Sequence, residues 1–131
     1  MNKTILLTGI ILGMLSVVLG AFGAHGLEKV LDADALNSFE TGIKYQMYHA
    51  LFLLVLGNMK QLDSKHKKWT YYFITIGIVF FSFSIYGLAT NSLTAINFKK
   101  IALVTPIGGT LLIIGWGVLG YKIIKKSNNI V

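Results

Sequence analysis

The sequence predicts an all-α protein, a four-helix transmembrane bundle with a short amphipathic interfacial helix in the first loop. Only 13% of the 131 residues are charged and 54% are hydrophobic, whereas about 25% of residues are charged in soluble domains. The apolar residues form four long runs separated by polar loops, which is typical of membrane helices. The runs are continuous rather than alternating, which disfavours a membrane β-barrel. We expect one domain over residues 1–131.

The first run, 4–24, contains no charged residue. At about 1.5 Å per residue it spans a hydrocarbon core of about 30 Å. A cleaved signal peptide is the alternative, because Lys3 precedes the run and the small residues Ala21 and Gly23 lie near its end. The run is longer than the usual apolar core of a signal peptide, so we expect a membrane helix.

The first loop contains an amphipathic segment over about 27–42. Its apolar residues recur every four positions, at Leu27, Leu31, Ala35 and Phe39, and acidic side chains fill much of the remainder. This spacing predicts a helix that lies in the outer membrane interface and leads into the second span. A helix that merely caps the bundle is the alternative.

The remaining apolar runs predict spans over about 43–59, 69–89 and 101–121. The loop at 90–100 is short and polar. Trp69 and Tyr121 lie at the ends of their runs, as aromatic residues of an interfacial belt do.

Lysine counts predict the orientation. Eight lysines lie in the N-terminus, the loop after the second span and the C-terminal tail, and four lie on the other side. This asymmetry predicts a multi-pass protein with both termini in the cytoplasm. The net charge is +7, but the lysines separate apolar runs and form no single basic face, so we expect no nucleic-acid partner.

Glycines on the first and fourth runs predict close helix packing. Gly9 and Gly13 form a GxxxG pattern, and other small residues continue the stripe. Small side chains let helix backbones approach each other in lipid. The residues expected to pack helices are Gly9, Gly13, Gly20, Gly23, Gly108, Gly109 and Gly115.

Polar residues near the outer ends of the runs predict a pocket. A titratable side chain beside an apolar run is costly, so His25 and His49 invite a functional reading. We expect these two histidines to face each other across the first loop. The other expected lining residues are Glu40, Tyr45, Gln46, Ser84, Tyr86, Thr105 and Pro106. Hydrogen-bonded packing groups and a tolerated kink at Pro106 are the alternative.

Several chemistries lack a signature. The chain has no cysteine and no HxxxH or HExxH motif, and its third histidine, His66, lies among loop lysines. We therefore expect no metal site, assign no catalytic residue and identify no cofactor. An enzyme is the less favoured reading.

Four motifs resemble a known family in their order along the chain. They are GAFGAHGL at 20–27, FETG at 39–42, YQMYHAL at 45–51 and TPIGG at 105–109. Together they resemble the small bacterial membrane proteins grouped as domain of unknown function 423. The resemblance extends over essentially the whole chain. It implies an integral protein of the bacterial cell membrane and supplies no substrate, cofactor or catalytic residue.

Two functions remain open. An accessory or structural membrane subunit is favoured because the chain is small; its partners would be the lipid bilayer and either another membrane protein or further copies of itself. The alternative is a small binding or transport module with an outward-facing pocket at His25 and His49.

Overall fold

A computed structural model describes residues 1–93 and 102–130, with side chains described up to residue 126. The described part of the chain is helical and contains no strand. Its elements in chain order are α1 (Asn2–His25), the 3-10 turn η1 (Leu27–Lys29), α2 (Ala33–Asn58), α3 (Ser64–Ile78), the π-helical turn η2 (Val79–Phe83), α4 (Ser84–Ala89), the 3-10 turn η3 (Asn91–Leu93) and α5 (Val104–Ile130). The first residue of the fourth expected span, Ile101, and the loop lysines Lys99 and Lys100 lie outside the described residues.

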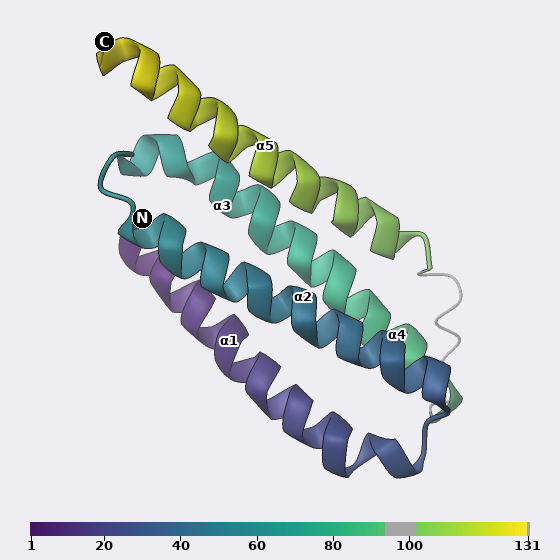
Figure 1. Cartoon of the computed structure of the whole chain (residues 1–131). Coiled ribbons are helices and arrows are strands. Elements are labelled where there is room, and N and C mark those ends of the chain that lie inside the picture. The colour runs from purple at the N-terminus through teal and green to yellow at the C-terminus, as the bar shows by residue number, and fades with distance from the viewer. Residues whose placement is uncertain (94–101, 131) are drawn as a thin grey trace.

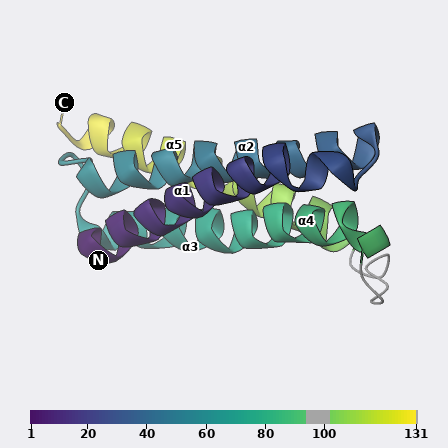
Figure 2. The ribbon, with the colours of Figure 1, turned by 90° about the horizontal axis from the view of Figure 1, so that it is seen from below.

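The helices lie side by side (Figures 1 and 2). α3, η2 and α4 form one continuous rod beside α2, α1 packs mainly on α2, and α5 packs on α3 and η2. Both chain ends and the α2–α3 loop lie at one end of the bundle, here called the lysine-rich end, where α1 also meets α3. Lys67 is 1% exposed there and donates a 3.0 Å hydrogen bond to Oδ1 of Asn2. The opposite end, with the α1–α2 connection and the start of α5, is called the acidic end.

Three helical segments are long and apolar enough to cross a membrane: Asn2–Lys29, Ser64–Ala89 and Val104–Lys126. α2 is not among them, because Lys44, Gln46 and His49 interrupt its apolar part. It nevertheless lies along most of α1. A Cβ added at Gly23 would contact Phe39 near one end of α2, and one added at Gly57 would contact Leu6 near the other. That α2 crosses the membrane remains a prediction.

The amphipathic segment differs from its expected form. Residues 27–29 form η1, residues 30–32 connect it to α2, and residues 33–42 are the first ten of α2. This helix begins where the Asp32 carboxylate accepts a 2.8 Å hydrogen bond from the Ala35 amide. The buried side chains of Leu27 and Phe39 pack with Tyr86 of α4. The apolar stripe is therefore covered by the chain's own helix, and α2 extends ten residues beyond the expected start of the second span at residue 43.

A π-helical turn interrupts the third expected span. η2 lies against α5 at Gly108, where an added Cβ would collide with the Phe81 amide nitrogen and lie 2.8 Å from the Gly77 carbonyl oxygen. A side chain here would separate the two backbones. Since π-helical turns often occur at functional positions, the residues around η2 are candidates for a functional site.

The other glycines expected to pack helices also face neighbouring helices. A Cβ at Gly9 would lie 2.9 Å from the Ala50 carbonyl oxygen, and one at Gly115 would lie 2.8 Å from Ile74. Gly13, Gly20 and Gly109 have ordinary contact distances of 3.6, 4.0 and 3.7 Å to side chains of the adjacent helix. These glycines thus line contacts inside the chain rather than a free outer surface.

Candidate functional site

A buried hydrogen-bond network in the middle of the bundle joins α1, α2 and α4. Gln46 is fully buried, and its Nε2 donates a 2.8 Å hydrogen bond to the Leu12 carbonyl oxygen of α1. The Tyr86 hydroxyl of α4 donates to Gln46 Oε1 at 2.6 Å. Ser16 also donates to the Leu12 carbonyl oxygen, at 2.9 Å. One amide side chain therefore links three helices and has partners at both of its polar atoms.

The approach of α4 to α2 depends on Gly42. A Cβ at Gly42 would lie only 2.6 Å from Cε1 of Tyr86. The Gly42 carbonyl oxygen accepts a 2.7 Å hydrogen bond from Ser82 in η2. Sequence reasoning did not select Gly42 or Ser82 for this role. The signals available in the sequence were a serine inside an apolar run and the glycine that ends the FETG motif.

His49 forms a second link, between α2 and α5. Its side chain is nearly buried, and its Nδ1 lies 2.7 Å from the Tyr45 carbonyl oxygen, which can only accept. Trp116 Nε1, which can only donate, lies 3.1 Å from His49 Nε2. These partners assign the neutral tautomer that carries its proton on Nδ1. Trp116, absent from the sequence-based expectation, also packs on Phe52 with ring centroids 4.4 Å apart.

The structure places His25 and His49 apart, contrary to the expected pair. His25 is exposed at the last residue of α1. His49 lies at the same position along the bundle axis as Gly13 of α1. A Cβ added at Gly13 would contact Met47 and Ala50, which lie on either side of His49 in the sequence. His25 lies twelve positions after Gly13 on α1, which is about 18 Å along the helix. The earlier start of α2 accounts for this separation, because it places His49 in the middle of the bundle.

The other expected pocket residues fall in separate places. Glu40 and Tyr45 are exposed, and the Tyr45 ring packs on Phe81 with centroids 5.1 Å apart. Ser84 of α4 and Thr105 of α5 share a 2.5 Å hydrogen bond. The nine residues therefore do not line one pocket.

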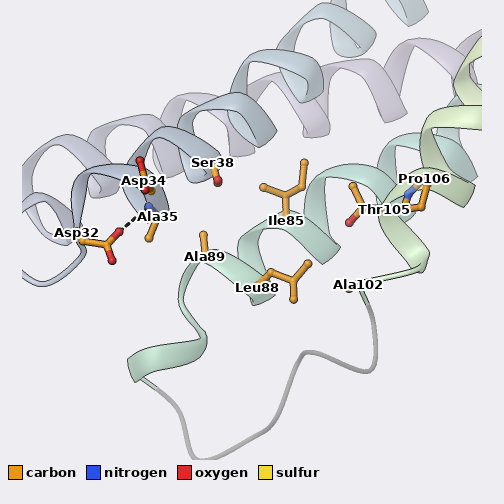
Figure 3. A pocket seen from close by; sticks show the side chains of 10 residues that line it. All are labelled: Asp32, Asp34, Ala35, Ser38, Ile85, Leu88, Ala89, Ala102, Thr105 and Pro106. Carbon is orange, nitrogen blue, oxygen red and sulfur yellow. Dashed lines mark hydrogen bonds between the residues drawn. The ribbon is translucent and has the colours of Figure 1, made fainter.

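A hollow of about 570 Å³ opens at the acidic end between α2, α4 and α5. Figure 3 shows Asp34 and Ser38 of α2 across from Thr105 and Pro106 of α5, with Ile85 and Leu88 between them. Two of the expected pocket residues, Thr105 and Pro106, thus line the same hollow as Asp32 and Asp34. Among the described residues no three His, Cys, Asp or Glu side chains gather as metal ligands would.

The sequence matches known proteins along most of its length. The family described as "Protein of unknown function (DUF423)" matches residues 19–109. A UPF0382 membrane protein of Staphylococcus saprophyticus is 44% identical over 114 residues, which cover 87% of this chain and 91% of that protein. The UPF0382 inner membrane protein YgdD of Escherichia coli is 36% identical over 119 residues, or 90% and 87% of the two chains. No solved structure matches significantly.

Proposed function

Since the chain belongs to the DUF423 family of bacterial membrane proteins, we propose that this integral membrane protein is a structural or accessory subunit of a larger membrane assembly. In this role it contributes a fixed set of helices to its partner. The proposal agrees with the small size of the chain, which leaves little room for an alternating-access pathway in a single copy.

The observation that carries the proposal is the internal pairing of two buried polar side chains, Gln46 and His49. Both polar atoms of Gln46 and both ring nitrogens of His49 form hydrogen bonds with other residues of the chain. A ligand site needs donors or acceptors that are free to meet the ligand. Here those groups hold α1, α2, α4 and α5 to each other, which supports a scaffold more than a binding cavity.

The outer helices offer surfaces for a partner. α1 exposes Val17 at 63% and Val18 at 57%, and α5 exposes Ile113 at 73%. Such faces contact either lipid tails or the helix of another membrane protein. We propose that the face of α1 meets the partner, because residues 4–24 carry no charge and their glycines already pack against α2.

Photocrosslinking in native membranes tests this assignment. A photoreactive amino acid is introduced in place of Val18 on α1, or in place of Ile113 on α5 as the matched position on the other outer helix. We expect a discrete protein adduct from position 18, either with another membrane protein or with a second copy. Recovery of lipid adducts alone from both positions, under several mild extraction conditions, contradicts a subunit role.

A binding module is the second candidate, and the hollow at the acidic end favours it. Its wall brings the Asp34 carboxylate across from the Thr105 hydroxyl over an apolar floor, which suits a small organic cation. Ethanolamine and choline are suitable probes. Thermal stabilisation that Asp34→Asn removes and Glu40→Gln leaves intact supports this candidate; no stabilisation of the wild-type protein contradicts it.

A further inference from the structure

An apolar groove of about 550 Å³ lies between α3 and α5 at the lysine-rich end. The two helices touch closely at Gly115, where an added Cβ would meet Ile74 and Phe73. Beyond this point a Cβ at Gly117 would meet nothing within 4 Å. The groove opens from there along α5, and Trp69, Phe73, Ile114, Gly117, Tyr121 and Lys122 line it.

Aromatic rings and lysines surround the mouth of the groove. The Lys68 ammonium lies 5.8 Å from the centroid of the Trp69 ring, and the Lys125 ammonium lies 6.0 Å from that of Tyr121. Lys122 lies on the wall itself. Cation–π contacts thus keep two ammonium groups beside an apolar slot.

The charge of this end is strongly positive. Residues 1–3, 59–68 and 121–126 contain eight lysines, and their one acidic residue is Asp63. The carboxylate of Asp63 is bonded to Nδ1 of His66, and this hydrogen bond lowers the pKa of Asp63 below its usual value. Asp63 therefore stays ionised, but eight lysines against this one carboxylate leave the end with an excess of positive charge.

We propose that the groove binds an anionic phospholipid of the bilayer, with one acyl chain against Gly117 and Phe73 and the phosphate beside Lys122 and Lys125. Lipid chains match the apolar wall, and a negatively charged headgroup matches the lysines. A water-soluble anion leaves the apolar slot unused, and a zwitterionic lipid makes poorer use of the lysines. This inference stands independently of the subunit role, since a lipid binds here with or without a protein partner.

Native mass spectrometry of the full-length protein tests the headgroup. The protein is released from detergent micelles in the presence of equimolar dioleoyl-phosphatidylglycerol and dioleoyl-phosphatidylcholine. We expect the phosphatidylglycerol adduct to dominate in the wild type. Each interfacial lysine contributes about fivefold to the binding of an anionic lipid, so Lys122→Gln/Lys125→Gln should weaken the adduct by more than about tenfold. Lys3→Gln/Lys60→Gln loses the same charge at the same end, away from the groove walls, and should retain it.

A matched pair of glycine substitutions tests the slot. Gly117→Leu fills the groove, whereas Gly120→Leu adds the same side chain to an open position that does not line it. We expect Gly117→Leu to remove the phosphatidylglycerol adduct and Gly120→Leu to keep it, with equal thermal stability of both variants. Equal adducts of the two lipids in the wild type overturn the proposal. It is also overturned if the two glycine variants bind alike, or if Gly117→Leu releases a bound protein instead of a lipid.

Discussion

Gln46 shows how much one residue can hold together in this bundle. Replacing it with leucine leaves the buried Tyr86 hydroxyl without its acceptor. We expect Gln46→Leu to lower the free energy of unfolding by about 1–2 kcal/mol, because interhelical hydrogen bonds in membranes are worth about that much. Unfolding by detergent titration measures the loss.

A double-mutant cycle with Tyr86→Phe separates the hydrogen bond from side-chain packing. If the bond is formed, Gln46→Leu/Tyr86→Phe should cost less than the sum of the single variants, because no unpaired group remains. Additive losses would show that the two side chains do not interact.

The tautomer of His49 is a second prediction at the residue scale. Its partners, the Tyr45 carbonyl oxygen and the Trp116 indole, require the proton on Nδ1. The ¹⁵N resonances of the imidazole should therefore report a protonated Nδ1 and an unprotonated Nε2. Trp116→Phe should shift the Nε2 resonance and leave Nδ1 nearly unchanged. A proton on Nε2 in the wild type would contradict the Trp116 contact.

At the element scale, the contact between the π-helical turn η2 and α5 involves two adjacent glycines, Gly108 and Gly109, whose surroundings differ. Gly108→Ala places its methyl group against the Phe81 and Gly77 backbones, whereas Gly109→Ala gains only ordinary contact with the Phe81 ring. We expect Gly108→Ala to destabilise the protein by about 1–3 kcal/mol through overpacking. Gly109→Ala should be neutral or stabilising by up to about 1 kcal/mol, because alanine is the better helix former. Thermal unfolding of both variants measures the difference, and equal stability would contradict the close contact.

Some helices could be predicted from the sequence alone and others could not. Long apolar runs report helices directly, and the expected spans at 4–24 and 69–89 fall on α1 and on the α3–α4 rod. The start of α2 was harder to predict from the sequence. Hydropathy falls before residue 43, but α2 begins at Ala33, directly after the Asp32 cap, and Phe39 near its start packs with Tyr86 of α4. Gln46 and His49 therefore lie deep in the bundle, and their partners on α1, α4 and α5 follow from packing that no local pattern encodes.

At the scale of the whole molecule, the distribution of charge separates the two ends of the bundle. The lysine-rich end holds both termini, and the acidic end holds Glu28, Asp32 and Asp34. We propose that the lysine-rich end is cytoplasmic, because lysine-rich segments next to membrane helices are retained there. The same orientation places the lipid groove at the cytoplasmic leaflet, whose negative surface potential attracts lysine-rich segments.

Single-cysteine labelling tests this topology and, with it, whether α2 crosses the membrane. The natural chain contains no cysteine, so Asp34→Cys and Lys60→Cys each introduce the only thiol. Both positions are exposed. Asp34 is the second residue of α2, and Lys60 lies two residues beyond the other end of this helix. A membrane-impermeant maleimide, applied to cells or spheroplasts with an intact cytoplasmic membrane, should label position 34 and should reach position 60 only after that membrane is permeabilised. Labelling of both positions from the outside would show that α2 does not span the bilayer despite its packing along α1. Labelling of position 60 alone would reverse the orientation and place the lysine-rich end outside, against the retention of positive charge in the cytoplasm.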